Sequence, residues 1–262
     1  MLLLFIYYLG AGLGVNLAYH RVLSHRALQL PRWMERSLVL LGLPAGTPVQ
    51  WVGNHRYHHA HSDTALDPHS PVHHGFWYAH VGWYIGSRNL IFCASYALAG
   101  PVRMLIDAWM RPRTNLQHNA LASDITTDPW YAWISRPLPY AVAMFLHAGI
   151  PIFIAYRYYG AEGIAAFWIT LVVLYNLGDA IESVAHLRGA RLASQRDASR
   201  NNAWLGILTL GEGWHANHHR FPRSARHGLL HGQFDLIWEI IVLLSAAGLA
   251  TKIHLPKEDV CR

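Results

Sequence analysis

Long apolar stretches constrain the fold of this chain more than any other feature of its sequence. A bilayer crossing by an α-helix needs about 20 mostly apolar residues. Three stretches meet this requirement, at residues 2–18, 138–156 and 163–181. A short connection joins the second stretch to the third, which predicts a helical hairpin. We therefore expect an all-α, integral-membrane helical bundle with three spans, formed by residues 1–262 as one domain.

The composition supports a membrane protein. Hydrophobic residues make up 53% of the chain and charged residues only 14%, whereas soluble domains average about 25% charged. Three further apolar runs, at residues 37–52, 90–102 and 236–250, are too short to span a bilayer. They predict buried or interfacial helices.

The cations indicate the sidedness of the spans. Ten arginines lie between Arg21 and Arg136, ten lysines and arginines lie between Arg188 and Arg262, and the hairpin connection carries only Arg157. By the positive-inside rule, both large polar regions are cytoplasmic, and an odd number of spans places Met1 outside. The same cations are also consistent with a basic patch for an acidic electron donor or for anionic head groups.

The two cysteines and the first residues bear on localisation. Cys93 and Cys261 form no CxxC pattern, which favours a reduced compartment and no disulfide framework. The sequence after Met1 has neither a basic region nor a cleavage site, so we expect no signal peptide. Nothing in the sequence predicts a nucleic-acid partner.

Histidine is unusually abundant, with 19 residues, and three clusters stand out. HxxHH spacing places imidazoles at i, i+3 and i+4 on one helix face, and imidazole is a ligand for Fe, Zn, Cu and Ni. HxxxxH spacing separates its two rings on a regular helix, so these two either serve different metals or sit on distorted backbone. The clusters are HRVLSH with His20 and His25, HRYHH with His55, His58 and His59, and HANHH with His215, His218 and His219.

A ninth candidate, His186, follows the third apolar stretch, and Glu182 lies four residues before it on the same helix face. With residues 37–52 not crossing the bilayer, all nine histidines fall on one side of the membrane. Nine imidazoles fit two metals with four to five ligands each and open positions for oxygen or water. Four carboxylates near the clusters either bind the second ring nitrogen of a histidine or are ordinary solvated charges: Asp63, Asp67, Asp197 and Glu212.

The remaining histidines are expected to be structural or exposed. His147 lies within a predicted span, where a polar side chain usually faces protein. His61, His69, His73, His74 and His80 lie near the second cluster, and local structure or support of the ligands is expected for them. The others expected to be ordinary polar residues are His118, His227, His231 and His254.

With these motifs in order, the chain resembles the membrane fatty acid desaturases, and in particular their Δ9, stearoyl-type group. The resemblance runs from about Gly10 to Lys252. It rests on HRVLSH, on HRYHHAHSDTALDPHSPVHHGFWYAHVGW at residues 55–83, on SVAHLRG at 183–189 and on GEGWHANHHRFP at 211–222.

The resemblance implies that the nine histidines ligate two irons in a cytosolic helical cap over the membrane domain. The irons would use O2 to insert a double bond, at Δ9, into a saturated fatty acyl chain held in a narrow tunnel. Trp51 is expected either in the tunnel wall or as a packing aromatic. The electrons would come from a separate protein of the ferredoxin or cytochrome b5 kind.

Three departures from the family modify this expectation. Members usually have four spans, so the chain resembles one that begins at the second span. Glu182 stands where animal enzymes have an asparagine that reaches a metal through water, and a carboxylate there could bind iron directly. Gly53 and Asn54 replace the Arg-Asp pair of many acyl-CoA enzymes, which favours a lipid-linked substrate.

Two alternative functions are compatible with the same residues. Hydroxylation, acetylenic-bond formation or oxidative decarboxylation would use the same oxidant with a different outcome. A non-catalytic membrane metal carrier would bind metal near the bilayer midplane, whereas most of the clustered histidines lie beyond the predicted span ends.

Overall fold

The computed structural model describes residues 2–193 and 195–257 of the chain, so Cys261 lies outside the described residues. Within them the chain is built from helices, and its only β pairings are isolated bridges such as that between Gln29 and Thr251. Free Cys93 is buried. The all-α class predicted from the sequence is confirmed.

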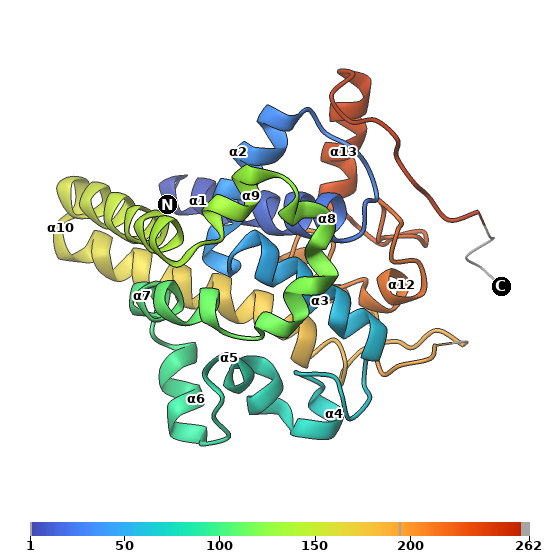
Figure 1. Cartoon of the computed structure of the whole chain (residues 1–262), viewed down its shortest axis with the longest axis horizontal. Helices are drawn as coiled ribbons and strands as arrows, with labels where there is room; N and C mark the ends of the chain where they lie inside the picture. Colours follow the sequence, from blue (N-terminus) through green and yellow to red (C-terminus); the bar gives the residue numbers. More distant parts are fainter. Residues whose placement is uncertain (1, 194, 258–262) are drawn as a thin grey trace.

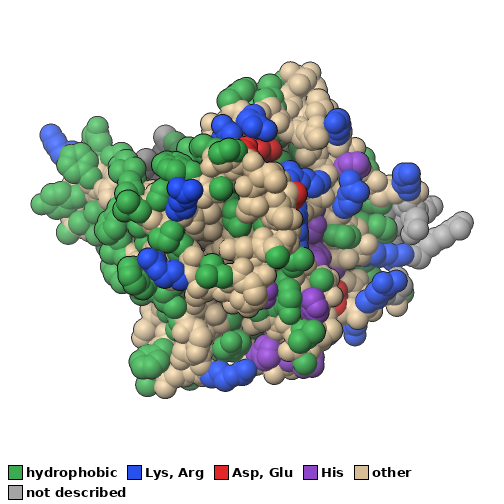
Figure 2. Space-filling view, in the orientation of Figure 1, with side chains coloured by type: hydrophobic (Ala, Val, Ile, Leu, Met, Phe, Trp, Pro, Cys, Tyr) green, Lys and Arg blue, Asp and Glu red, His purple; other side chains and the backbone are tan. Residues whose placement is uncertain are grey.

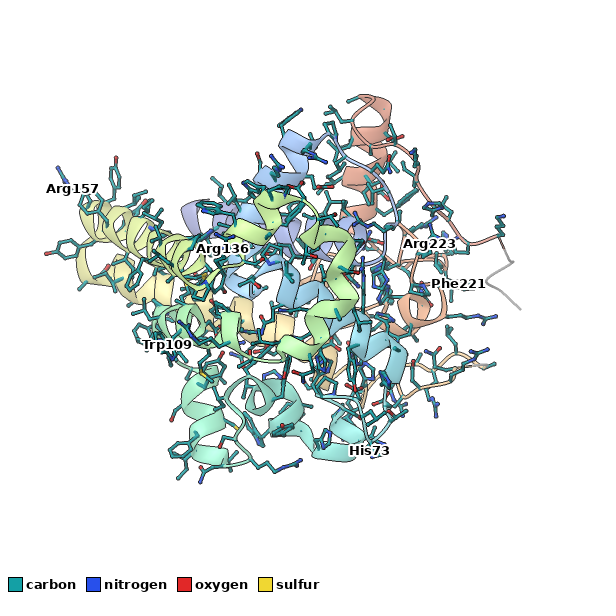
Figure 3. The ribbon with its side chains drawn as sticks, in the orientation of Figure 1. His73, Trp109, Arg136, Arg157, Phe221 and Arg223 are labelled. Atoms are coloured by element: carbon teal, nitrogen blue, oxygen red, sulfur yellow. The ribbon has the colours of Figure 1, made fainter. Side chains whose placement is uncertain are left out.

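The largest element is the helical hairpin α10, Pro137–Ser183, drawn at the left of Figure 1. Its 47 residues are interrupted at Gly160, whose backbone is non-helical (φ 58°, ψ −145°). Beyond this break Gly163 lies against the Ala155 carbonyl, where a Cβ would come within 2.2 Å of the oxygen. Arg157 lies at the far tip of the hairpin (Figure 3). The predicted pair of helices with a turn between them is confirmed.

Hydropathy separates α10 from the other helices. Among the described residues it is the one helix long and apolar enough to cross a membrane. At about 1.5 Å per residue its 47 residues are roughly twice the length that one crossing needs. Its outward side chains are apolar and exposed, including Leu138, Phe145 and Phe153. Figure 2 shows the hydrophobic side chains gathered over this end of the molecule.

The first apolar stretch does not form one regular α-helix. The α-helix α1 (Leu2–Gly12) changes its winding into the π-helix η1 (Leu13–Ser24). A span over residues 2–18 therefore stays a prediction. Helices α6 (Leu90–Ala97) and α7 (Pro101–Met110) are each short; together they pass the length and hydropathy test only across a bend of 113°.

The other two short apolar runs also form short helices. Residues 37–52 contain the end of α2 (Arg32–Gly42), the 3₁₀ turn η2 (Leu43–Ala45) and the start of α3 (Pro48–His61). The chain turns at Gly46 (φ 134°), and the Thr47 hydroxyl then caps α3 by accepting from the Gln50 N–H. Residues 236–250 form α13 (Leu236–Ala246).

Short helices and turns complete the chain. They are α4 (Pro71–His74), η3 (Tyr78–Gly82), α5 (Trp83–Ile85), η4 (Arg111–Arg113), η5 (Leu116–Ala122), α8 (Ser123–Thr126), α9 (Pro129–Ile134), α11 (Ala203–Leu208) and α12 (His215–Arg220).

Two large apolar clusters hold these elements together. One joins η1, α2, α3 and α13 through residues such as Leu17, Val39 and Ile237. The other joins α7 to both limbs of α10, with Met104 packed among Met144 and Phe167. The first cluster fixes α3 and includes Leu210 and Ala225, which lie before and after α12, and the second cluster fixes α10. The histidine-bearing ends of these three helices therefore meet in one region.

Helices η1 and α2 approach so closely that only glycine fits between them. A Cβ built on Gly14 would lie 2.3 Å from the backbone nitrogen of Gly42. No real Cβ tolerates this distance, and the obstacle is backbone rather than a flexible side chain. The glycine therefore sets the position of η1, which carries His20.

We predict that Gly14→Ala destabilises the protein by about 1–3 kcal/mol, as overpacking of a helix contact does. Thermal unfolding of the detergent-purified protein would measure the change. Gly149→Ala is the matched control, because a Cβ at Gly149, also helical, meets no atom within 4 Å. Equal unfolding midpoints for the two variants would contradict the prediction.

Candidate metal centre

The nine histidines predicted as ligands lie in two groups, each able to hold a metal ion. In the first group one ring nitrogen of each residue lies within 4.8 Å of all the others. The Nε2 atoms are 2.8 Å apart for His25 and His55, and 2.9 Å apart for His20 and His218. The members, from η1, α3 and α12, are His20, His25, His55, His59 and His218.

The second group meets the same distance criterion with four histidines. The Nε2 atoms of His186 and His215 are 3.0 Å apart, and both rings lie against the ring of His219. The members are His58, His186, His215 and His219. Each HxxHH motif thus divides between the two groups, since α3 and α12 each contribute to both.

The π-helix explains how His20 and His25 reach the same group. The His25 N–H donates to the His20 carbonyl, five residues back, at 3.1 Å. This i→i+5 bond is the repeat of a π-helix and brings residues five apart onto one face. Of the two readings of the HxxxxH spacing, distorted backbone is therefore right, and the two rings do not serve different groups.

Each of the four predicted carboxylates accepts a hydrogen bond from the outer nitrogen, Nδ1, of one histidine. Glu212 accepts from His20 at 2.5 Å. The other three contacts are 2.7–3.0 Å long and join Asp63 to His186, Asp67 to His58, and Asp197 to His219. Such bonds fix the ring orientation and the tautomer of a metal-binding histidine.

These outer bonds leave the inner nitrogens without protons. A neutral imidazole whose Nδ1–H donates to a carboxylate carries a bare lone pair on Nε2. The Nε2 atoms of His58 and His219 are buried without a hydrogen-bond partner. Two ligands at right angles, about 2.1 Å from one ion, would be about 3.0 Å apart, and the observed separations of 2.8–3.0 Å fit this arrangement. The residues therefore fit a pair of metal ions.

The electrostatic setting favours neutral rings at His25, His55, His59 and His218. At His58 the effect of burial is outweighed by Glu182 and Asp67, which raise the pKa of this ring to about 9. Burial lowers the pKa of His55 well below 6.5, and the neighbouring His20 and His25 rings lower it further. Burial would raise the pKa of Glu212, but His227, His20 and Arg21 together hold it well below its usual value. Unprotonated imidazoles and ionised carboxylates are the forms that bind metal and orient ligands.

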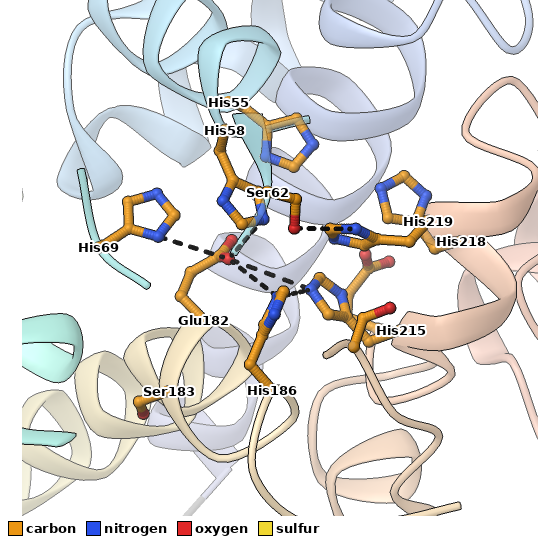
Figure 4. A network of polar contacts seen from close by, with 12 residues as sticks. His55, His58, Ser62, His69, Glu182, Ser183, His186, His215, His218 and His219 are labelled. Carbon is orange, nitrogen blue, oxygen red and sulfur yellow. Dashed lines mark hydrogen bonds and ion pairs between the residues drawn. The ribbon is translucent and has the colours of Figure 1, made fainter. Parts of the chain in front are cut away.

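Glu182 faces the second group. Its Oε2 atom lies 3.4 Å from His58 Nε2, 3.9 Å from His186 Nε2 and 4.0 Å from His215 Nε2, as Figure 4 shows. This oxygen is buried and has no hydrogen-bond partner among the described residues. Its position suits a fifth donor atom for the second group.

Two residues of the site, His227 and Arg21, were missed by the sequence reasoning, and His69 was expected only to have a local structural role or to support the ligands. His69 Nδ1 lies 3.8 Å from Glu182 and forms a further potential group with His58 and Asp67. His227, expected to be an ordinary polar residue, is buried beside His20 and Glu212. Arg21 is fully buried and pairs with Glu212 at 3.0 Å. Isolated residues of these types carry no spacing pattern that would single them out.

The remaining histidines have local roles. His80 bridges to Ser183 and Asn176 on α10. His147 contacts the Leu40 carbonyl on α2, so it faces protein as predicted. His118 and His61 both stack on Tyr57. His73 and His74 contact the carbonyls of their own loop.

A cavity of about 180 Å³ adjoins both groups. His20 and His55 of the first group line it, as do His215 and Glu182 at the second, and Trp51 forms part of its wall. The Trp51 ring is stacked on His55 with centroids 4.8 Å apart. Apolar residues of η1 and α10, such as Val15 and Leu174, line other parts of it.

We predict that Asp67→Asn weakens metal retention by about 10–100-fold, the usual effect of removing an outer partner of a ligating histidine. Asp67 is completely buried and holds His58 from behind. Metal content after dialysis against graded chelator would measure the loss. Glu162→Gln, which changes an exposed carboxylate in the hairpin turn, is the control. Equal retention in both variants would contradict the prediction.

Comparison with known proteins agrees with the geometry. The family model "Fatty acid desaturase" matches residues 1–242. The chain is 37% identical over 254 residues to a chloroplastic "probable lipid desaturase" of Arabidopsis thaliana, covering 94% of this chain and 61% of that protein.

Two further relatives come from other organisms. An "acyl-CoA C20 Delta5-desaturase" of Anemone leveillei is 36% identical, over 94% of this chain and 70% of its own length. An "sn-2 palmitoyl-lipid 9-desaturase" of Nostoc sp. (strain 36) is 34% identical, over 96% and 80%. The chain thus spans about three fifths of the length of the Arabidopsis relative and more of the others. With three histidine motifs and a family match over nearly its whole length, the chain belongs to the fatty acid desaturase family.

Proposed function

We propose that the protein is an O2-dependent acyl desaturase with two irons held by the nine histidines. The observation that carries the proposal is the convergence of two groups of inward-facing imidazole nitrogens beside one partly apolar cavity. Bound iron would supply the chemistry that uses O2 and two electrons to remove two hydrogens from adjacent carbons. The balanced reaction converts one CH2–CH2 pair, O2, two electrons and two protons into CH=CH and two waters.

The protein's own residues hold and orient the reactants. Five histidines form the first ligand set, and four histidines with Glu182 form the second. The carboxylates behind the rings keep Nε2 free of protons and pointed inward. Trp51 stacks on His55 and lines the cavity. Its ring would contact the acyl chain and hold one carbon pair at the metal centre.

The metal donors separate this function from a metal carrier. Six of the nine histidines are buried, and the outer nitrogens of four are fixed by carboxylates. This rigidity favours permanently bound ions rather than exchange.

The substrate and partners follow from the family. Relatives are named for acyl-lipid substrates and for acyl-CoA substrates. Because Gly53 and Asn54 lack the charges of the acyl-CoA enzymes, we favour a lipid-linked acyl chain as substrate. We favour insertion of the double bond at Δ9 because the chain resembles the Δ9 group of the family. The electron donor would be a separate ferredoxin or cytochrome b5-type protein. We further propose a multi-pass membrane protein of one domain, with the metal centre in a cap on the cytoplasmic side, supported by the apolar α10 hairpin.

We predict that His58→Ala or His218→Ala abolishes the unsaturated product while leaving membrane insertion intact, because each removes a ligand from a different group. The measurement is the fatty-acid profile, by gas chromatography, of a host that supplies a compatible donor. His231→Ala, which changes an exposed histidine, should keep activity. A hydroxylated product without any alkene from the unmodified protein would refute desaturation.

Glu182→Gln should lower the iron content from about two towards one per chain, because the second group has only four imidazoles. The amide keeps the shape of the side chain but removes the charge that faces His58. Elemental analysis and Mössbauer spectroscopy would measure the content and the environment of the iron. Two irons per chain with an unchanged spectrum would exclude Glu182 as a ligand.

A further inference from the structure

One wall of the cavity carries buried charges that the metal centre does not use. Arg103 and Arg111, from α7 and η4, line the same space as His20, His55 and Glu182. Both arginines are buried, with 1% and 4% exposure. Asp179 on α10 and Tyr84 lie beside them in the cavity wall. A buried charge is costly unless it is paired and hydrogen-bonded.

Arg103 uses both of its terminal nitrogens in a structural contact. It donates to both Asp179 oxygens, at 2.6 and 3.1 Å, and so joins α7 to α10. Its guanidinium also lies over the Tyr96 and Tyr175 rings, 4.6 and 4.2 Å from their centroids. This bidentate pair holds the wall in place and leaves Asp179 little capacity for another partner.

Arg111 is not satisfied in the same way. Its Nε, like that of Arg103, has no hydrogen-bond partner among the described residues, but no carboxylate there takes up its Nη atoms as Asp179 does for Arg103. The nearest carboxylate oxygen, Asp107 Oδ1, is 3.4 Å from Nε. The guanidinium carbon lies 3.6 Å from the centroid of the Tyr84 ring. Gly46 carries no Cβ, which would stand 3.9 Å from Nη1. A stacked, oriented guanidinium in a cavity wall presents its free N–H donors to whatever fills the cavity.

We propose that Arg111 binds the carbonyl oxygen of the acyl substrate and is a specificity-determining residue of the enzyme. The inference rests on the proposed function, since it assigns the head of the chain that the metal centre would oxidise. It specifies the chemical class of that head as an ester or thioester carbonyl.

The charge balance of the wall selects a neutral head over a carboxylate. Two arginines, Arg103 and Arg111, are matched there by two aspartates, Asp107 and Asp179. A free fatty acid would add one negative charge to a balanced, buried set, and an unpaired buried charge is strongly unfavourable. A carbonyl accepts the Arg111 donors without changing the net charge.

Holding the carbonyl also fixes the reacting carbons. The residues at the metal centre and Arg111 line one continuous cavity. A chain anchored at its carbonyl presents the same carbon pair to the metals in every turnover. Loss of the anchor would let the chain slide and spread the double bond over neighbouring positions.

The test is a binding measurement that needs no turnover. Methyl stearate and 1-methoxyoctadecane differ only in the carbonyl, and each would compete with fluorescent methyl parinarate for the purified protein. We expect the unmodified protein to bind the ester about tenfold more tightly than the ether, as one hydrogen bond to a charged group allows. In Arg111→Gln the ester and the ether should bind about equally well. Free stearate should compete more weakly than the ester.

Arg113→Gln is the matched control. Arg113 lies in the same 3₁₀ turn, is exposed and stacks on Trp109, 3.9 Å from the ring centroid, so its loss should leave the ester preference unchanged. Trp109 lies on the outer side of α7 in Figure 3. An unmodified protein without ester preference, or a preference that persists in Arg111→Gln, would overturn the proposal.

A second variant and two further competing ligands complete the experiment. If Arg111→Gln binds neither compound, Arg111→Lys decides. Lysine keeps a positively charged N–H donor, so this variant must retain part of the preference for the ester. Stearoyl-CoA and monostearoyl glycerol as competitors identify whether a thioester or a glycerolipid ester is preferred. If the protein is not a desaturase, the fatty-acid profile of membranes will contain no new alkene. If only the role of Arg111 is wrong, the alkene will form, the ester preference will be absent or will persist in Arg111→Gln, and the double-bond position will be unchanged in that variant.

Discussion

The structure depends on a repeated contact in which a buried carboxylate holds the outer nitrogen of a histidine. This contact decides where the proton of each ring resides and therefore where its lone pair points. Of the four contacts, that between His58 and Asp67 is local, and the other three join residues 22 to 192 positions apart. These three hold η1, the loop after α3, the segment after α10 and the region around α12 together. The fold around the cavity is in this sense organised by the orientation of imidazoles as much as by apolar packing.

An apolar outer face and a polar interior meet along α7. Its outer residues Val102, Leu105 and Trp109 are exposed and apolar, and its inner residues Arg103 and Asp107 are buried and charged. This reverses the usual order of a soluble amphipathic helix. The reversal agrees with the proposed membrane location, because lipid would solvate the apolar side and only partners within the protein could solvate the charges.

Local patterns were sufficient to predict much of this arrangement. The spacing of HRYHH and HANHH, together with the apolar lengths, predicted the hairpin α10 and the meeting of the histidines. The HxxxxH spacing left distorted backbone open as one of two readings, but nothing in LGVNLAYHRVLS specifies a π-helix. The i→i+5 bond of His25 reveals this winding. Arg103, Asp107 and Asp179 resemble surface charges in the sequence, since their partners lie on other helices. His227 was missed for the same reason.

The division of the HxxHH motifs has a mechanical consequence. His58 and His59 are neighbours on α3, yet they belong to different ligand groups, and His218 and His219 repeat this on α12. The spacing between two bound ions is therefore set by adjacent peptide units of two helices rather than by flexible side chains. Neither ion could shift alone without bending a backbone, so the pair would behave as one rigid unit through each change of charge.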